Sequence, residues 1–469
     1  MIIASILVAA AVAVSSPLGV APTATLPDSI VRRIDAVFAP YDHPDVPGCA
    51  VGVYQNGAIA FERGYGSANL EYGVPITPTT PFIMGSVSKQ FTAAAIALLV
   101  EQGRLSLDDD VRKYIPELPD YGKRITIDEL VHHTSGLRDF WALVGAAGMR
   151  WDDTYAVSDV LALAERQKHL EFAPGTAYDY SNTGYVILGE IVRRVSGRSL
   201  ARFAAEEIFA PLGMTHTHFQ DDHTVIVPGR AYAYTPAGRG GWRIDVWNND
   251  IVGQGGLMTT VEDLQKWDEN FYTGQVGGPR FLAQQLVQGR LADGTVLRYA
   301  FGLEVGTYRG LRLVEHTGST GGYRTIISRF PSAHTSVVAL CNASNVNTTT
   351  LSHQVADAVL ASAFTQPPPA APVAAAPAVR LAAAKPRAMT TPAAARFAAR
   401  YHSDELDATF VIRDSVGTLV LDRPRRPSEA LTPVNAHTFR ADDMTLTFGA
   451  AGFMLDVGRA RGIEFLKLH

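Results

Sequence analysis

Short apolar runs bounded by turn residues indicate strands near the start of the chain. Two such runs, residues 49–54 and 58–62, flank Gln55-Asn56-Gly57. Asn-Gly tolerates the positive φ angles of a tight hairpin turn, so this pattern predicts two antiparallel strands joined by that turn. Much later in the chain, three more runs predict three successive strands, at residues 311–315, 323–330 and 336–340.

Apolar residues at helical spacing predict helices between and after these strands. One buried helix is expected over 91–105, with Gly103 stopping it, and another over 184–195, with Gly197 just beyond its end. A closing helix is expected over about 351–363. Strands at both ends with helices between them predict an α/β fold of the α+β type. In this fold, the first and last hairpins meet in one antiparallel sheet, and the helices between them form an insertion.

Composition divides the rest of the chain into a spacer and a second unit. The first unit covers residues 28–364, and residues 366–394 are rich in Pro and Ala, which is typical of a semi-rigid linker. Apolar and polar residues then alternate over 396–469. This period-two pattern predicts a small all-β domain, either an up-and-down sheet or a small barrel.

The N-terminus carries an unbroken apolar run from Ile2 to Val14, followed by small residues. The run is shorter than the roughly 20 residues that span a bilayer and matches the apolar part of a signal peptide, although no Lys or Arg precedes it. We therefore expect residues 1–24 to be a signal peptide and the mature protein to be exported, periplasmic or secreted. A mis-assigned start or a short membrane anchor is the alternative, and no other segment could be transmembrane.

Composition and charge exclude several classes of protein. Of 469 residues, 47% are hydrophobic and 19% charged, which supplies enough material for a buried core and excludes a wholly disordered chain. The net charge is −5 and no long Lys/Arg block occurs. A nucleic acid partner is therefore not expected, because its phosphates would require a basic surface.

The two cysteines are too few for a disulfide scaffold or a metal site. Cys49 opens the first predicted strand and Cys341 follows the last. If those strands are antiparallel neighbours, the thiols could form a bridge in an oxidising compartment. Two buried free thiols are the outcome we expect.

Ser86-Val87-Ser88-Lys89 is the first candidate for chemistry. It lies at the start of the helix predicted near Phe91, and the i, i+3 spacing places the Ser86 hydroxyl and the Lys89 amine on one helical face. A serine hydroxyl becomes a nucleophile when a nearby base takes its proton, and a buried lysine with a lowered pKa can serve. Ser-x-x-Lys alone is a weak signal, and its structural alternative is an ordinary helix start.

Two further motifs could complete such a site. In Tyr180-Ser181-Asn182, we expect Tyr180, as phenol or phenolate, to exchange a proton with Lys89. Asn182 would bind the substrate amide or Lys89, or simply cap the following helix. His316-Thr317-Gly318-Ser319 ends a predicted strand, where the Ser319 and Ser86 backbone N–H groups could hold an oxyanion. Gly318 would permit the close backbone approach.

These three motifs, in this order, resemble the serine hydrolases that include class C β-lactamases, penicillin-binding DD-peptidases, D-aminopeptidases and related esterases. The resemblance covers about residues 30–362. It implies a five-stranded antiparallel sheet flanked by helices with a helical subdomain, and a site at their junction. It also implies an acylated Ser86, a base formed by Lys89 and Tyr180, and no cofactor. Three intervening phrases look similar to the family, at residues 132–137, 211–214 and 255–260.

The third motif departs from the commonest pattern. β-Lactamases and DD-peptidases mostly carry Lys where this chain has His316, which would be only partly charged near neutral pH. Members with His at this place include D-aminopeptidases and esterase- or peptidase-like relatives. The resemblance therefore favours a small peptide, D-amino acid derivative or ester as substrate, with His316 and Asn182 orienting it. A β-lactamase, or a non-hydrolytic penicillin-binding or peptide-sensing module, is the alternative.

Other polar clusters receive structural interpretations. We expect the His132-His133 pair to end a helix, with a histidine satisfied by backbone groups. The His- and Asp-containing segment 216–223 is interpreted as a solvated loop, because it lacks metal-ligand spacing. Trp247, Asn248 and Asn249 either line the substrate cleft or form a surface turn. The sequence leaves the oligomeric state open.

Overall fold

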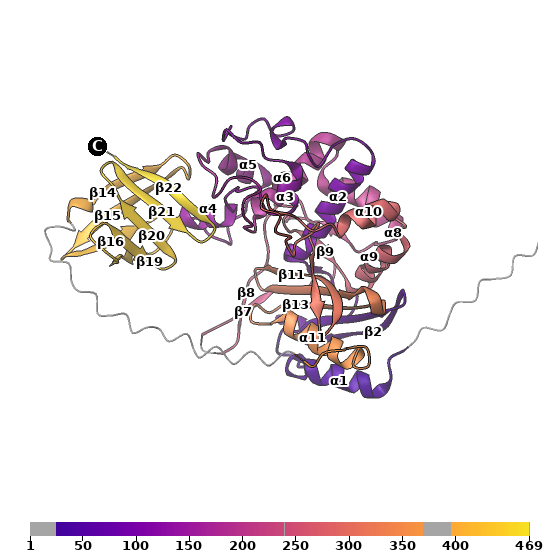
Figure 1. The fold of residues 1–469 in the computed structure, drawn as a ribbon. Coiled ribbons are helices and arrows are strands. Elements are labelled where there is room, and N and C mark those ends of the chain that lie inside the picture. The colour runs from indigo at the N-terminus through magenta and orange to yellow at the C-terminus, as the bar shows by residue number, and fades with distance from the viewer. Residues whose placement is uncertain (1–24, 239, 369–394, 469) are drawn as a thin grey trace, which may run out of the picture.

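The computed structural model describes residues 25–238, 240–368 and 395–468. These residues form an N-terminal α/β region and a separate C-terminal β-domain, defined here as residues 395–468 (Figure 1). The predicted signal peptide and most of the predicted linker lie outside the described residues. Among the described residues, every helix is too short or too polar to span a bilayer.

A six-stranded antiparallel sheet forms the centre of the N-terminal region, in the order β10-β11-β12-β13-β1-β2. The first and last hairpins meet through β1 and β13, as the sequence predicts. Asn56 and Gly57 at the β1–β2 turn both have positive φ, at 51° and 78°. The strands are β1 (Cys49–Gln55), β2 (Ala58–Tyr65), β10 (Glu304–Tyr308), β11 (Leu311–Thr320), β12 (Tyr323–Phe330) and β13 (Thr335–Cys341).

The expectation of five strands is wrong by one, because β10 pairs with the first half of β11. Its sequence, Glu-Val-Gly-Thr-Tyr, buries only Val305 fully and therefore carries little apolar alternation. The expectation of two free thiols is also wrong. Cys49 and Cys341 lie directly opposite each other on neighbouring strands, with Cα atoms 4.0 Å apart, and form a disulfide.

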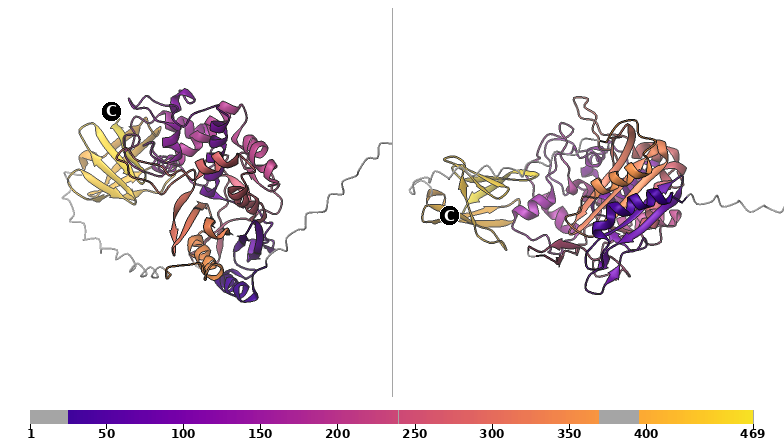
Figure 2. Two further views of the ribbon diagram at one scale, coloured as in Figure 1. Left: turned by 45° about the vertical axis from the view of Figure 1, so that its right-hand side comes forward. Right: turned by 90° about the horizontal axis from the view of Figure 1, so that it is seen from below.

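Helices cover both faces of this sheet. On one face, α1 (Asp28–Phe38) packs beside α11 (Thr348–Val359), as the view from below shows (Figure 2). On the other face lie α2 (Lys89–Glu101), α9 (Val261–Thr273) and α10 (Gly278–Gln285). The burial of nearly every residue of α2 makes it the centre of the larger core.

The helical insertion contributes α6 (Asn182–Ser196), a long buried helix that packs against α2. Ser181, and not Asn182, is its N-cap: the Ser181 hydroxyl accepts a hydrogen bond from the Gly184 backbone. Gly197 ends the helix with φ of 75°, as predicted. The remaining helices are α3 (Ile127–Val131), α4 (Phe140–Ala146), α5 (Val157–Glu165), α7 (Leu200–Ala204) and α8 (Ala210–Leu212).

Short strand pairs complete the N-terminal region. They are β3 (Ser67–Asn69) with β4 (Val74–Pro75), β7 (Tyr234–Pro236) with β8 (Trp242–Ile244), and β9 (Leu257–Thr259) between β5 (Phe82–Ile83) and β6 (His218–Phe219). The pairing of β5 with β9 holds the segment immediately before Ser86, so it fixes where the first catalytic candidate lies.

The C-terminal β-domain is one nine-stranded antiparallel sheet, in the order β17-β16-β15-β14-β22-β21-β20-β19-β18. Its edge strands β17 and β18 are separated only by Leu431, so the sheet curls into a nearly closed barrel, one of the two predicted forms. The strands are β14 (Ala399–Ser403), β15 (Ala408–Ser415), β16 (Thr418–Asp422), β17 (Glu429–Ala430), β18 (Thr432–Pro433), β19 (Thr438–Ala441), β20 (Met444–Phe448), β21 (Gly452–Val457) and β22 (Ala460–Lys467).

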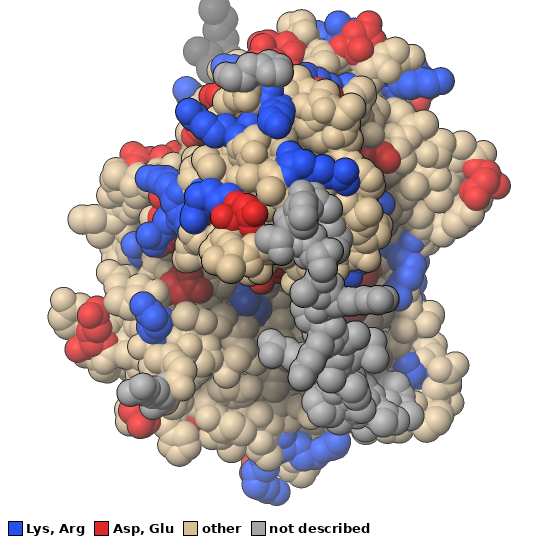
Figure 3. Space-filling model, turned by 90° about the vertical axis from the view of Figure 1, so that its left-hand side faces the viewer, with Lys and Arg blue, Asp and Glu red and all other residues tan. Residues whose placement is uncertain are grey.

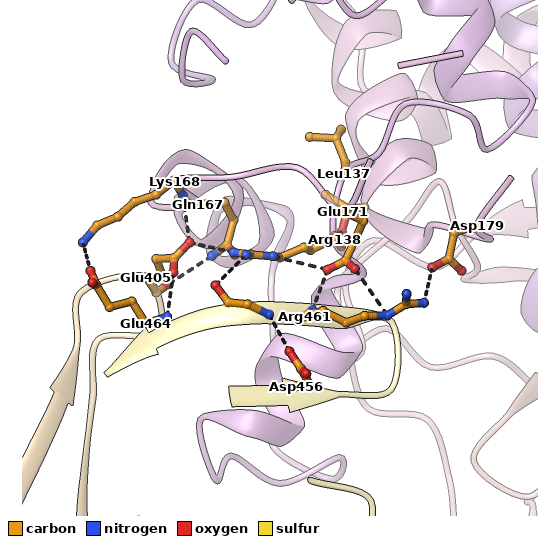
Figure 4. Close-up of polar contacts among 12 residues, drawn as sticks. Leu137, Arg138, Gln167, Lys168, Glu171, Asp179, Glu405, Asp456, Arg461 and Glu464 are labelled. Atoms are coloured by element: carbon orange, nitrogen blue, oxygen red, sulfur yellow. Dashed lines mark hydrogen bonds and ion pairs between the residues drawn. The ribbon is translucent and has the colours of Figure 1, made fainter. Parts of the chain in front are cut away.

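A buried ion cluster joins the β-domain to the N-terminal region. Arg138 lies between Glu171 and Glu405 (Figure 4), and its Nη1 is 2.6 Å from Glu405 Oε1. The Arg138 and Glu405 side chains are 1% and 0% exposed. Glu405 also accepts hydrogen bonds from the backbones of Lys168 and Glu464. Because every charge in the cluster has partners, the cluster fixes the β-domain in one orientation.

We expect Glu405→Gln to lower the free energy of unfolding by about 3 kcal/mol, because it leaves the buried Arg138 charge without its closest partner. Urea denaturation of the whole chain measures the change. Asp404→Asn is the matched control, since Asp404 is exposed and pairs with Lys168 at 3.3 Å across the same interface. The control should cost less than about 1 kcal/mol. Equal losses in the two variants would contradict the assigned role of Glu405.

Candidate active site

Ser86 lies in a 3₁₀ turn, Gly85–Ser88, that leads directly into α2. The helix predicted over 91–105 begins two residues earlier than expected, at Lys89, and ends at Glu101. The Ser88 hydroxyl fixes this turn, because it donates to Gly85 O at 2.6 Å and accepts from Leu257 N at 3.1 Å. Ser86 itself is half-buried and lines a cleft.

The Lys89 amine lies against the Ser86 hydroxyl, as the motif predicts. Lys89 Nζ is 3.1 Å from Ser86 Oγ, 2.8 Å from Asn182 Oδ1 and 2.7 Å from Gln254 O. The last two atoms can only accept hydrogen bonds. A neutral amine has two N–H donors and one lone pair, so donating to Asn182 and Gln254 leaves the lone pair for the Ser86 proton.

Asp139 sets the orientation of the Asn182 amide. Asp139 Oδ2 accepts from both Asn182 N and Asn182 Nδ2, at 2.7 and 2.8 Å. Because Asn182 Nδ2 donates to this carboxylate, the side-chain oxygen of Asn182 must face Lys89. Asp139 is 1% exposed and also caps α4 by accepting from Trp141 N. It therefore positions a group that contacts the Lys89 amine.

The environment of Lys89 favours its uncharged form. The side chain is fully buried, and burial lowers its pKa well below the usual value. Asp139 raises the pKa by a smaller amount, while the nearby cation of Arg459 lowers it further. Since a base must be unprotonated to accept a proton, an amine in this environment could act as a base.

Tyr180 lies beside the same amine. Lys89 Nζ is 4.7 Å from the centre of the Tyr180 ring, and the His133 ring packs against that ring at 4.3 Å. Burial raises the pKa of Tyr180, although the Ser86 hydroxyl lowers it slightly, so the side chain rests as a phenol. The phenol oxygen is shielded from solvent and has no hydrogen-bond partner among the described residues.

The free end of β11 passes beside the Ser86 turn. Strand β10 begins at Glu304, opposite Glu315, so the part of β11 after Glu315 has no strand partner on that edge among the described residues. A Cβ on Gly318 would lie 1.9 Å from Met84 O, and one on Gly85 would lie 2.7 Å from Ser319 N. Glycine at both positions therefore permits the contact that brings Ser319 N near Ser86, as an oxyanion site requires.

His316 lies beneath this site and does not line the cleft. Its Nδ1 donates to Thr317 O at 2.6 Å, and its Nε2 accepts from the Tyr299 hydroxyl at 2.9 Å. Burial, with a smaller contribution from Lys89, lowers the pKa of His316 to about 4. The imidazole is thus neutral at physiological pH, and its contact with substrate stays a prediction.

The cleft beside Ser86 has a volume of about 1010 Å³. It includes Tyr180, Asn182 and Ser319 among the predicted site residues. Segment 247–249 lines it as well, which favours the cleft interpretation over a surface turn. Another wall comes from Arg425 and Arg459 of the C-terminal β-domain.

Arg459, at the turn between β21 and β22, reaches into the site. Its Nη1 donates to Tyr180 O at 2.7 Å, and its Nη2 is 3.3 Å from Asp139 Oδ1. Asp139 N in turn donates to Arg459 O at 3.2 Å. The β-domain thereby touches both Tyr180 and the carboxylate that orients Asn182.

Sequence reasoning did not assign five residues that contact this machinery: Gly85, His133, Asp139, Gln254 and Arg459. Each acts through a tertiary contact that carries no local motif, except that His133 and Gln254 lie in or beside phrases noted for the family resemblance. The backbone-satisfied histidine that the sequence predicts is His132, whose nitrogens contact Asp128 O and Val287 O at 3.1 Å.

One group of possible metal ligands occurs among the described residues: Asp222, His223 and Asp250. Asp222 is exposed, and His223 Nδ1 is 2.8 Å from Asp250 Oδ1. A hydrogen bond between the latter two side chains accounts for their positions without a metal. The group is partly within the loop that the sequence analysis interprets as solvated.

Residues 34–361 match the Beta-lactamase family, so the chain belongs to that family. A D-aminopeptidase of Gluconobacter oxydans is 30% identical over 318 residues, which cover 67% of this chain and 59% of that protein. A D-aminopeptidase of Brucella canis is 31% identical over 294 residues, covering 59% and 53%. The chain thus spans little more than half the length of these curated relatives.

Solved structures share the fold. The octameric penicillin-binding protein homologue from Pyrococcus abyssi has a TM-score of 0.62 at 24% identity, and covers 91% of this chain and 94% of its own. D-amino acid amidase from Ochrobactrum anthropi SV3, complexed with L-phenylalanine amide, has a TM-score of 0.58 at 22% identity, with 71% and 99% covered. The first of these similarities extends across both regions of the chain.

We expect Gly318→Ala to lower kcat/KM for ester hydrolysis about 100-fold, because the added methyl group would push β11 away from the Ser86 turn and displace one oxyanion donor. Gly145→Ala is the control, since a Cβ there meets nothing within 4 Å and its φ is ordinary for helix α4. Full activity in the Gly318 variant would show that β11 does not contribute to the oxyanion site.

The pH dependence of kcat/KM reports on Lys89. Activity should fall as the pH drops through the pKa of Lys89, because the protonated amine cannot accept the Ser86 proton. Arg459→Gln removes a cation that lowers this pKa, so the acidic limb of the profile should move to higher pH. Arg461→Gln, in an exposed side chain of the same strand region, should leave the limb in place. A movement to lower pH in the Arg459 variant would refute the electrostatic argument.

Proposed function

We propose that the protein is a serine acyl hydrolase that forms an acyl-enzyme on Ser86. The main support is the arrangement at Lys89. Its amine donates to two acceptors, Asn182 Oδ1 and Gln254 O, and its remaining lone pair faces the Ser86 hydroxyl. Membership of the Beta-lactamase family supports the same chemistry. The proposed substrate is a small peptide, a D-amino acid derivative or an ester.

In the acylation step, the Ser86 Oγ–H bond breaks and its proton moves to Lys89 Nζ as Oγ attacks the substrate carbonyl carbon. The Ser86 and Ser319 backbone N–H groups donate to the resulting oxyanion. The carbonyl then re-forms, and the bond to the leaving group breaks. The leaving group takes the Tyr180 phenol proton, which the Lys89 ammonium replaces.

Water completes the cycle. Lys89, again neutral, takes a proton from water as its oxygen attacks the acyl carbon, and the bond to Ser86 Oγ breaks. Ser86 Oγ regains a proton from the Lys89 ammonium, so the enzyme returns to its starting state. This sequence predicts ping-pong kinetics with the first product released before water reacts.

The substrate preference follows from His316 and from the relatives. A neutral, buried His316 supplies no cation at the third motif, the position where β-lactamases and DD-peptidases mostly carry Lys, and this difference supports a peptide, amide or ester as substrate. The relatives named D-aminopeptidase support D-amino acid amides and peptides as the first compounds to assay.

Export from the cytoplasm is part of the proposal. The apolar N-terminal run is typical of a signal peptide, and the Cys49–Cys341 disulfide is the kind of bond that persists in an oxidising compartment. Together these two features support a periplasmic or secreted location for the folded enzyme.

A fluorophosphonate probe tests the proposal. Intact-protein mass spectrometry should show one adduct on the wild type, none on Ser86→Ala, and labelling slowed at least 1000-fold in Lys89→Met, since the base is lost while the side-chain length is kept. Lys113→Met, in an exposed lysine, is the control and should label normally.

Equal labelling of wild type and Ser86→Ala would reject Ser86 as the nucleophile, and unchanged labelling of Lys89→Met would reassign the base. A stable adduct from a peptide or ester substrate, with no turnover, would identify a non-hydrolytic binding module instead. Comparing p-nitrophenyl esters, D-amino acid amides and a chromogenic cephalosporin then ranks the substrate classes.

A further inference from the structure

The cleft beside Ser86 is rich in arginine. Its lining includes five guanidinium groups and only two carboxylates, on Asp152 and Asp245. The arginines come from distant parts of the chain: Arg150 follows α4, Arg243 lies on β8, and Arg425, Arg426 and Arg459 belong to the C-terminal β-domain. Figure 3, which views the molecule from the side of that domain, shows groups of Lys and Arg on its surface.

Three of the five arginines are already paired with carboxylates. Arg150 forms an ion pair with Asp152, and Arg425 forms one with Asp153. Arg459 is held by Asp139 and by the Tyr180 carbonyl, as described above. These three guanidinium groups therefore have structural partners within the protein.

Arg243 and Arg426 have no carboxylate partner among the described residues. Arg243 is exposed on β8, and its side chain makes no hydrogen bond or ion pair with the described residues. Arg426 Nη2 donates to Met149 O at 2.6 Å, while its Nε is buried and has no partner there. Both residues line the cleft, and each guanidinium group keeps N–H donors that have no partner among the described residues.

The remaining charges do not cancel this excess. Asp152 is engaged by Arg150. Asp245 is the other carboxylate of the lining, so five guanidinium groups face two carboxylates. Lys89 and His316 favour their neutral forms. The lining of the cleft therefore carries a net positive charge.

We propose that Arg243 and Arg426 form an anion-binding subsite that selects acyl donors bearing a carboxylate. The proposal rests on the proposed acyl hydrolase function and specifies its substrate class. A guanidinium group can hold a carboxylate by two parallel hydrogen bonds, which suits it to this role. Trp141, Trp151 and Trp247 line the same cleft and reduce contact with water, which strengthens such a pair.

The residues of this subsite lie outside the third motif, residues 316–319. His316 is buried and neutral, so it supplies no cation to a substrate. The cations come instead from the β7–β8 hairpin and from the C-terminal β-domain. The β-domain would then contribute to substrate selection as well as to the position of Tyr180.

Two matched substrate pairs test the proposal. On the acyl side, mono-p-nitrophenyl glutarate is compared with p-nitrophenyl butyrate, which lacks the carboxylate. On the leaving-group side, N-acetyl-D-Ala-D-Ala is compared with its C-terminal amide. For each pair the measured quantity is the ratio of kcat/KM for the anionic substrate to that for the neutral one.

We expect the wild type to prefer the anionic member of at least one pair, and the pair that shows it identifies the side on which the carboxylate binds. The double variant Arg243→Gln/Arg426→Gln should lower that ratio about tenfold. Increasing the salt concentration should lower it as well, because exposed charges are screened. Arg440→Gln, in an exposed arginine on β19 outside the cleft, should keep the wild-type ratio.

A wild type with no preference in either pair, or a double variant that retains the preference, would overturn the subsite. The neutral ester separates this failure from that of the proposed function. If the neutral ester is hydrolysed and Ser86 is labelled, only the subsite is rejected. If neither occurs, the acyl hydrolase proposal fails and the subsite falls with it.

Discussion

The central constraint in this structure is a buried amine whose surroundings favour its uncharged form. Lys89 has no access to water, so its hydrogen-bond partners decide what it can do. Asn182 and Gln254 accept its two N–H groups, and the third direction faces Ser86. Helix α6 contributes to this arrangement because it begins at Asn182, whose side-chain amide must keep one orientation to accept from Lys89. Asp139 fixes that orientation by accepting hydrogen bonds from Asn182 N and Nδ2. These hydrogen bonds offset the free-energy cost of burying the Asp139 carboxylate.

The site is shared between two parts of the chain that are joined by a buried ion cluster. Arg138 and Glu405 fix the β-domain against the helical insertion, and one residue later Asp139 meets Arg459. The same contact surface thus provides both attachment and electrostatic adjustment of the base. Because Arg459 donates to the Tyr180 backbone carbonyl, a displacement of the β-domain would also move the Tyr180 side chain.

The sequence predicts those features that depend on local spacing. Ser86 and Lys89 are three residues apart, and any helical turn brings them together. The Asn56-Gly57 hairpin and the cap at Gly197 are likewise short-range. The contacts that sequence reasoning missed join residues far apart, such as Arg459 and Asp139, whose side chains look like ordinary surface charges when considered alone. Strand β10 escaped prediction for a different reason: it lies at a sheet edge and buries little apolar surface.

The central pairing of β1 with β13 has a consequence for how the chain matures. Cys49 and Cys341, which face each other in this pair, are separated by 292 positions. The first hairpin therefore cannot pair with β13 until the chain has been synthesised as far as Cys341. Assembly with such high contact order is slow, and it leaves the early strands exposed on the ribosome. Because the two cysteines face each other only in the paired strands, the disulfide joins β1 to β13 once this central pair has assembled.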